Sequence, residues 1–500
     1  MSTTYTRPGV FVNETLGTLP SGSAPPATAI VAFVAAATRG STTPVLVDSW
    51  AAFNTLFGSF ADSAYLALAV YAYFQNGGTP CYVLRVAHSD AVSATRSTND
   101  QGSTAQPTLS LTAVNPGTWG NGITFDITAS YVDSRFNLIV HYGGTQVEQF
   151  VDLTMESTDP RYAPVIINAS SQYVIAADLH SENVAPDNEP LIQSGTALAT
   201  GVDGGAAVAS DFTAALATIG SIAQPVLLNL PGVSDSTILA ASQSWVAAAD
   251  QSNVFQVIDP APSSDVATVL TFSASLTPTS YGAGYYPWVV ISDPSRPLTS
   301  ASTVAIPPGG PVLAKYVATD SASGPFQTPA GTNVSVKAVG LQTTLATADY
   351  STLNSANPPV NAIKPIPGYG ICVFGGRTLQ PGFPSLYVAI RRSLIYIEQA
   401  LRNATQFAVF KPNDPALWST IDGIVTAWLT DYWGQGGLFG QSANEAFFVT
   451  CDSTNNTPTS IQSGVVNITV GVALEYPAEF VVINIGQYQG GATTTNTLTA

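Results

Sequence analysis

The sequence predicts a multidomain protein of the α+β and α/β classes, with a mixed-sheet core, an inserted β-rich domain and an extended β arm at each end. The chain has 500 residues, which exceeds the usual size of one domain. Charged residues make up 9% of it, compared with about a quarter of an ordinary soluble domain. Apolar runs of strand length alternate with helical stretches. We therefore expect a β-rich protein whose weakly charged surface is mostly covered by copies of itself.

The N-terminal part divides into an arm and an α/β segment. Residues 1–25 are rich in Thr, Pro, Gly and Ser and contain one short β-like piece, Val10–Val12, which predicts an extended arm. Residues 26–95 form the first core segment, with a helical stretch at Ala61–Phe74. Its strand-like runs are Ala29–Ala36, Val45–Val47 and Tyr82–Val86.

A change of composition near residue 93 indicates the start of an insertion. About fifteen residues rich in Ser, Thr, Gln and Asp read as a linker. Strand signals follow at Ile123–Ile127 and Phe136–His141, with a turn after Tyr142. We therefore predict an inserted β-rich domain over residues 96–198.

The remaining chain returns to an α/β pattern. Residues 199–335 alternate helices at Ala209–Leu216 and Ser236–Ala249 with strands at Val226–Leu230 and Val254–Ile258. Helical crossovers of this kind favour a partly parallel sheet. Residues 336–486 form a second α/β unit that ends in a strand pair, Val466–Leu474 and Phe480–Ile485, and the Thr-rich residues 487–500 form a C-terminal arm.

Charge, cysteines and apolar run lengths exclude several classes of protein. A net charge of −17 argues against nucleic acid as a partner, because phosphate contacts need clustered Lys and Arg. Cys81, Cys372 and Cys451 are too far apart for a disulfide framework or a metal pair, so we expect buried free thiols. No signal peptide is visible, and the longest apolar run, Ala29–Ala37, is short of the roughly 20 residues that span a bilayer. We expect synthesis in a cytoplasm and no direct membrane insertion.

An enzymatic reading finds no support in the motifs. His88, His141 and His180 lie far apart, and no nucleophile elbow, zinc-protease motif or P-loop occurs. Asp203-Gly204 is more simply a turn, Asp259-Pro260 a strand end, and Gly434–Gly440 has the wrong spacing for a dinucleotide loop. We assign no catalytic residue, cofactor or metal site. A surface adhesin fits the Thr and Ser content, but it predicts a signal peptide or repeats, and neither is seen.

About a dozen short blocks between Asn361 and Gln487 follow the order of one known family. They include Asn361–Ile366, Gly370–Leu379, Tyr387–Glu398, Phe410–Asp414, Leu417–Trp418, Gly437–Gly440, Glu445–Phe447, Val449–Asp452, Pro477–Phe480 and Ile485–Gln487. In this order they resemble the C-terminal half of contractile phage tail sheath proteins. The family also includes the sheaths of related contractile injection systems and bacteriocins.

The resemblance continues through the rest of the chain. Matching blocks in the first half are Arg7–Glu14, Val45–Trp50, Phe53, Phe57-Gly58, Phe74–Gly78, Cys81–Arg85 and Asn115–Asn121. Later ones are Asp203-Gly204, Ile258-Asp259, Tyr285–Trp288, Ile306–Gly309 and Pro329-Ala330. The regions near residues 90–108, 155–198 and 332–350 contain no block that matches the family.

The resemblance implies a structural subunit rather than an enzyme. Such subunits polymerise as stacked hexameric rings around a tail tube and contract to drive the tube through the target cell envelope. The implied partners are further copies of the chain, the tail tube protein, and the baseplate and tail terminator proteins. The implied location is a virion tail assembled in the host cytoplasm, with residues 96–198 facing outward. A bacteriocin-like or other injection particle is the alternative to an infectious phage.

Two sets of residues are candidate sites under this resemblance. The terminal arms would add strands to neighbouring subunits' sheets, although frayed termini are the simpler alternative. The arm residues are Pro8, Gly9, Val10, Phe11, Val12, Phe480, Val482, Ile483, Ile485 and Gln487.

The second set is a basic patch expected to face the tube. Its members are Lys364, Arg377, Arg391, Arg392, Arg402 and Lys411, and Glu398 is the one acid in that stretch. Helical spacing predicts a buried stripe with the arginines on other faces. Reversing Arg391 and Arg392 to Glu is then expected to weaken tube binding without unfolding the subunit. A solvated helix face, with Glu398 paired to Arg402, is the alternative.

Overall fold

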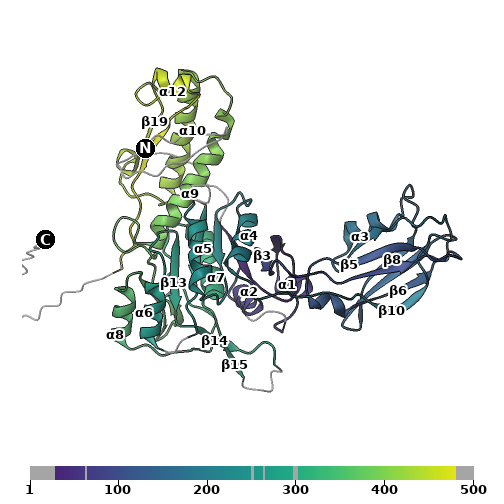
Figure 1. Ribbon diagram of the computed structural model, residues 1–500. Helices are drawn as coiled ribbons and strands as arrows, with labels where there is room; N and C mark the ends of the chain where they lie inside the picture. Colours follow the sequence, from purple (N-terminus) through teal and green to yellow (C-terminus); the bar gives the residue numbers. More distant parts are fainter. Residues whose placement is uncertain (1–28, 62–64, 249–252, 263–264, 297–301, 480–500) are drawn as a thin grey trace, which may run out of the picture.

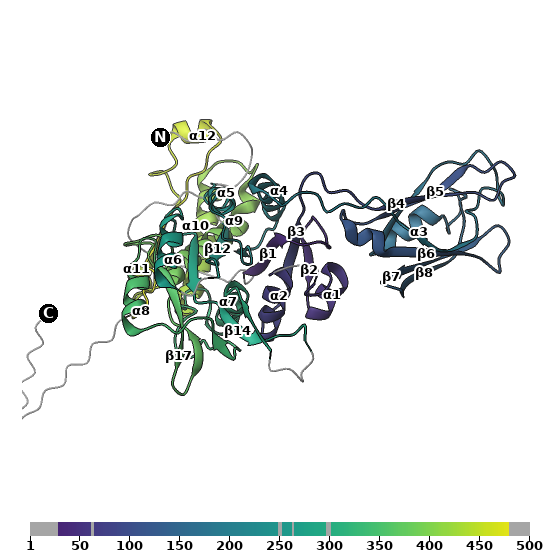
Figure 2. The same ribbon diagram turned by 60° about the horizontal axis from the view of Figure 1, so that its bottom comes forward.

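The computed structural model of this protein describes residues 29–61, 65–248, 253–262, 265–296 and 302–479. The predicted arm residues Pro8–Val12 and Phe480–Gln487 lie outside the described residues. In Figures 1 and 2 a central body carries two projections, one formed by the inserted segment and one by the C-terminal helices.

The body is built on a sheet whose order is β18-β17-β13-β12-β11-β1-β3-β2 among the described residues. Neighbouring inner strands pair in parallel. They are β17 (Val360–Ile366), β13 (Gly282–Tyr286), β12 (Val254–Ile258), β11 (Val226–Asn229), β1 (Ile30–Ala36) and β3 (Cys81–Val86). The edge strands β18 (Gly370–Val373) and β2 (Val45–Val47) run antiparallel to their neighbours. The predicted mixed, partly parallel sheet is confirmed.

Helices cover both faces of this sheet, which explains its near-continuous apolar strands. Val31 and Phe33 of β1 pack with α2 (Leu66–Gln75) and α7 (Gly309–Ser323), whereas Ala32 and Val34 pack with α4 (Ala209–Ile219). The other body helices are α1 (Trp50–Phe57), α5 (Ser236–Val246), α6 (Val266–Ala274) and α8 (Thr347–Asn354). The approach of α2 and α7 requires glycine, because a Cβ on Gly310 would lie 2.3 Å from the Ala69 carbonyl oxygen.

The inserted segment contains two antiparallel sheets, here called the lobe (Thr95–Ala197). One sheet has the order β4-β5-β9 and the other β10-β6-β7-β8 in the described part of the chain. The strands are β4 (Thr95–Asn99), β5 (Pro107–Ala113), β6 (Ile123–Ala129), β7 (Phe136–Tyr142), β8 (Thr145–Leu153), β9 (Val174–Asp178) and β10 (Gln193–Ala197), with a 3₁₀ turn at Thr118–Gly122 and α3 (Ala163–Ser170). Both sheets share one apolar core, and Figure 2 shows the lobe standing clear of the body. The exact domain boundaries stay a prediction.

Arg39, from the loop after β1, fixes the lobe to the body. Its guanidinium carbon lies 5.1 Å from the ring centroid of Trp119, 4.7 Å from that of Tyr142 and 5.0 Å from that of Tyr173, all in the lobe. Its Nη2 donates to the carbonyl oxygen of Thr55 in α1 at 2.7 Å, and the residue is buried. One cation therefore holds three lobe aromatics against the body.

The C-terminal projection is a helical unit with a small sheet. It comprises α9 (Val388–Thr405), a 3₁₀ turn (Gln406–Ala408), α10 (Pro415–Gly434), α11 (Ala443–Ala446), β19 (Phe447–Thr450), α12 (Pro458–Gln462) and β20 (Thr469–Val472). The expected strand over Val466–Leu474 shortens to β20, whose partner is β19. A further small sheet, β15-β14-β16 (Thr303–Ile306, Val289–Ser292, Gly340–Leu341), flanks the body. Among the described helices none combines the length and apolar character that crossing a bilayer requires.

Candidate functional site at the root of the C-terminal arm

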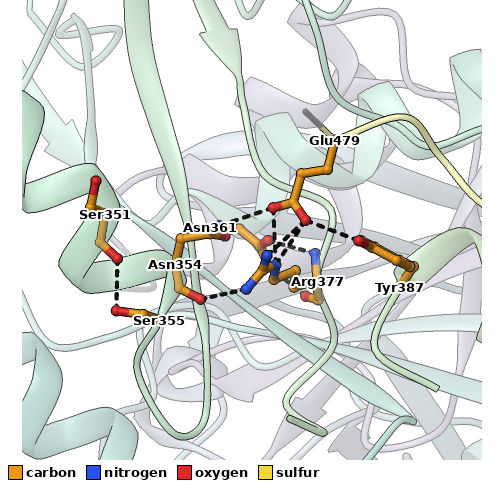
Figure 3. Close-up of polar contacts among 7 residues, drawn as sticks. All are labelled: Ser351, Asn354, Ser355, Asn361, Arg377, Tyr387 and Glu479. Carbon is orange, nitrogen blue, oxygen red and sulfur yellow. Dashed lines mark hydrogen bonds and ion pairs between the residues drawn. The ribbon is translucent and has the colours of Figure 1, made fainter. Parts of the chain in front are cut away.

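The last described residues, up to Glu479, precede the segment that the sequence predicts to be a C-terminal arm, and they are here called the arm root. Arg377, in the loop after β18, binds the Glu479 carboxylate as a fork (Figure 3). Its Nε lies 2.9 Å from Oε1, and its Nη2 lies 2.7 Å from Oε2. Two parallel, charge-assisted hydrogen bonds fix orientation as well as position. The arm root is thereby tied to the body by a directional contact.

Two further side chains complete the binding of this carboxylate. Asn354, the last residue of α8, donates through Nδ2 to Oε1 at 2.9 Å, and the Tyr387 hydroxyl donates to Oε2 at 3.0 Å. Burial raises the pKa of Glu479, but the hydrogen bonds from Arg377 and Asn354 and the Arg377 charge outweigh it, so the pKa lies below its ordinary value. The carboxylate is therefore held ionised at neutral pH.

Arg377 is itself held by the sheet through Asn361 of β17. The Asn361 side chain accepts from Arg377 N at 2.7 Å and donates to Arg377 O at 2.7 Å and to Gly284 O of β13 at 3.1 Å. Gly375 lets this loop approach, because a Cβ there would lie 2.8 Å from the Asn361 Cα. Hydrogen bonds thus connect Glu479 through Arg377 and Asn361 to the central sheet.

We call Asn354, Asn361, Arg377, Tyr387 and Glu479 the arm-root cluster. Only Arg377 was among the site residues predicted from sequence. The signal for three others was present, because Asn361, Tyr387 and Glu479 each lie in a separate sequence block that matches the tail sheath family. Glu479 follows Arg377 by 102 residues and Tyr387 by 92, so the chain order hides a meeting that Figure 3 shows directly.

The six predicted basic residues do not form one exposed patch. Arg377 belongs to the arm-root cluster, and Lys364 lies over the rings of Phe374 (3.8 Å) and Tyr350 (5.0 Å). Lys411 is exposed and Arg402 is half-buried. The tube-facing role of these residues stays a prediction.

Arg391 and Arg392 lie inside the subunit, so the expectation that they face away from the buried stripe is wrong. Both are 3% exposed. The Arg391 guanidinium lies over the Tyr281 ring at 4.4 Å, and Arg392 pairs with the buried Asp320 of α7. The reason is the position of α9, which is covered from several sides and has thirteen of its eighteen residues buried. A helical stripe identifies one buried face but does not show whether other elements cover the rest.

The remaining predicted features have structural roles. Cys81, Cys372 and Cys451 are buried and free, as expected. Asp259 directly follows β12, and its carboxylate accepts from Gly309 N (2.7 Å), Asn229 Nδ2 (3.0 Å) and Gly232 N (3.2 Å). Burial raises the pKa of Asp259 to about 6. Asp203 binds the backbone and hydroxyl of Thr118 at the lobe.

Comparisons of sequence find similarity to the same family that the blocks resemble. Residues 384–487 match the family model of the phage tail sheath C-terminal domain. The tail sheath protein of Vibrio phage KVP40 is 27% identical over 154 residues, which are 30% of this chain. The match spans 22% of that relative's length.

Comparisons of structure extend over almost the whole chain. A chain of the anti-feeding prophage baseplate is 21% identical with a TM-score of 0.58, covering 97% of this chain and 100% of that one. The sheath complex of the PVC extracellular contractile injection system, in the contracted state, is 21% identical with a TM-score of 0.57. The match covers 97% of this chain and 99% of that one. The sheath tail protein of Listeria innocua is 16% identical with a TM-score of 0.60, and the match covers 88% of this chain and 90% of that one. The resemblance to tail sheath proteins and the predicted fold class are confirmed.

Proposed function

We propose that this chain, whose fold is that of tail sheath proteins, is a structural subunit of a contractile sheath. The observation that carries the proposal is that sequence and fold agree. The C-terminal residues 384–487 match the sheath domain, and the similarity to solved sheath structures covers 97% of the chain. The subunit polymerises around a tail tube and contracts to drive the tube through a target cell envelope. It carries out no catalysis.

The partners follow from this role. The chain binds copies of itself in stacked hexameric rings, and it binds the tail tube, baseplate and tail terminator proteins. The similar structures include a six-fold symmetrised baseplate and a contracted helical sheath, which supports assembly in rings. The site of action is the tail of a particle assembled in the host cytoplasm, and the lobe faces outward from it.

The arms link the subunits in this proposal. In the described part of the chain, β19 and β20 form a two-stranded sheet, and an isolated bridge between Leu438 and Leu474 adjoins its end. An open edge offers unpaired N–H and C=O groups to an added strand. The arm residues Pro8–Val12 and Phe480–Ile485 of neighbouring copies supply these strands, and the arm-root cluster anchors the C-terminal one to the body that pulls on it.

Contraction needs no nucleotide in this mechanism. Subunits assemble in an extended arrangement of higher energy, and contraction releases that energy through better-packed surfaces between subunits. The arms keep neighbours connected while the bodies rotate. An anchor made of directional hydrogen bonds suits this role, because it transmits force without letting the arm slide.

A bacteriocin-like or other injection particle is the alternative setting. Two of the most similar structures come from the anti-feeding prophage and the PVC injection system. The same subunit serves either setting, so the choice depends on whether a genome is ejected or a cell is killed without one.

Electron microscopy of the purified chain tests the proposal. Full-length protein is compared with a version lacking residues 1–14 and 487–500. Hollow striated tubes from the intact chain and dispersed particles from the truncated chain are expected. Tubes from both would refute linkage by the arms while leaving the sheath assignment standing. Failure of the full-length chain to form tubes, even on an added tail tube and baseplate, would refute the sheath assignment.

A further inference from the structure

The loop between α9 and α10 lies at the outer end of the C-terminal projection, because α9 leads away from the body and α10 leads back to it (Figure 1). Phe410 in this loop is 88% exposed, and Phe407 and Lys411 are exposed beside it. We call these three residues the tip. Aromatic side chains with so little cover from their own subunit are suited to packing against another molecule.

The backbone presents the tip in an ordered turn. Phe410 has a φ of 65°, a left-handed conformation that bulky residues rarely adopt. Lys411 N donates to Ala408 O at 3.1 Å, which closes the turn. Just after the tip, Asp414 caps α10 by accepting from Leu417 N at 2.9 Å. Backbone strain of this kind concentrates at functional positions, and a preorganised turn loses little freedom on binding.

A cleft of about 480 Å³ lies beside the arm-root cluster, whose Tyr387 and Glu479 form part of its wall. Phe374 and Tyr476 also line the cleft, and they remain 45% and 49% exposed, so aromatic surface is open to an occupant. The volume lies in the range of ordinary ligand sites, about 300–1,000 Å³. Such sites hold molecules larger than one phenylalanine side chain, so the cleft has room for the Phe410 ring.

The cleft and the tip carry complementary charges. Glu475 lines the cleft and is half-buried, and Lys411 extends the tip. Neither takes part in an ion pair among the described residues, whereas Glu479 is already neutralised by Arg377. A Lys–Glu pair at the rim of an aromatic contact fixes its register and disfavours wrong partners.

The tip and the cleft of one subunit cannot meet, because α10 (Pro415–Gly434) separates them. The tip precedes the first residue of this helix, and Gly436, which lines the cleft, follows its last residue. A helix of 20 residues is about 30 Å long. The tip can therefore reach this cleft only on another copy of the chain.

We propose that the tip of one subunit binds in the cleft of a neighbouring copy, with the Phe410 ring against Phe374 and Tyr476 and with Lys411 beside Glu475. The contact joins two different surfaces, so it repeats from copy to copy and either closes into a ring or continues as a helix. It rests on the proposed self-assembly and adds a second link to that of the arms. A patch of this size is weak by itself, but it recurs in every subunit and gains from the tethering that the arms provide.

Charge reversal on both surfaces, followed by mixing, tests the contact in the full-length chain. Lys411→Glu and Glu475→Lys are each expected to lower the yield of tubes at least about tenfold, because like charges then face each other. Sedimentation and electron microscopy measure the yield. An equal mixture of the two variants should regain most of it, since each tip then meets a cleft of opposite charge on the other variant. Phe410→Ala should lower the yield as well, and the matched control Tyr131→Ala, which removes an exposed aromatic from the lobe, should not.

Unchanged yields from both charge variants would overturn the contact while leaving sheath assembly intact. A loss of tubes that mixing does not restore would also overturn it, because Lys411 and Glu475 then have different partners.

Carbodiimide coupling of the wild-type chain gives a readout that does not depend on tubes. In concentrated mixtures of isotope-labelled and unlabelled subunits, mass spectrometry should find an amide link between Lys411 of one chain and Glu475 of another. Absence of this link, or coupling of Lys411 to added tail tube protein instead, would overturn the proposal. Failure of the wild-type chain to form tubes, with the link present, would count against the proposed function alone.

Discussion

Replacing Arg392 by Glu tests the reassignment of this residue from the surface to the interior. Arg392 is 3% exposed, pairs with Asp320, and has its guanidinium carbon 4.8 Å from the Tyr316 ring centroid. Breaking a buried pair by removing one partner costs about 3–5 kcal/mol, and a desolvated cation–π contact adds about 2 kcal/mol. The new carboxylate would also lie beside Asp320, and two like charges repel. A loss of roughly 5 kcal/mol or more is a large share of the ~5–15 kcal/mol that stabilises a domain.

Thermal unfolding followed by calorimetry, together with soluble yield, measures the effect. The matched control is Lys411→Glu, which makes the same charge change at an exposed position and should alter stability by no more than about 0.5 kcal/mol. We expect Arg392→Glu to lower the melting temperature strongly or abolish soluble expression. A repair variant, Asp320→Leu with Arg392→Met, should regain most of the loss because it leaves no buried charge unpaired. A charge-reversed protein as stable as the wild type, with only tube binding weakened, would refute this reasoning and restore the surface assignment.

Three further predictions concern other contacts. Arg377→Ala should release the arm root, making the chain after Glu479 sensitive to protease and lowering the yield of assembled tubes with little change in subunit melting. Arg377→Lys should fail to rescue tube yield because a single ammonium cannot form the fork, and full rescue would contradict the assigned geometry. Arg39→Ala removes a cation over three rings and a hydrogen bond to Thr55, a loss of roughly 3–5 kcal/mol at the joint. Limited proteolysis should then cut near residues 88–94 and 199–206, whereas an uncut joint would argue against this contact. Asp259 has a pKa raised to about 6, so its contribution to stability is present below its unfolded pKa of about 4 and is lost as pH rises through about 6. Asp259→Asn should remove that part of the pH dependence, and an unchanged difference in stability between pH 4 and pH 7 would contradict the assignment.

Patterns that act over short distances along the chain were readable from sequence. Strand Val254–Ile258 was predicted with the bounds that the structure shows, and helix α4 differs only at its end. Strand signals separated by a turn likewise predicted a β-rich insertion. Helix α1 was missed because its eight residues offer barely two turns of periodicity. The alternating run Val466–Leu474 was read as one long strand, although within the described residues only Thr469–Val472 forms a strand, paired with β19.

By itself, the sequence determined the fold class, the broad succession of α/β and β-rich segments and the tail sheath resemblance, because hydrophobic period and ordered motifs are properties of neighbouring residues. Only the tertiary structure decided which polar residues are buried and which meet. Arg391 and Arg392 are interior because other elements cover α9 from sides that its own periodicity does not reveal. Asn361, Arg377 and Glu479 meet in the arm-root cluster because the fold brings segments that are distant along the chain into contact. Burial and long-range pairing depend on how elements pack together, and that information is not contained in any single stretch of the chain.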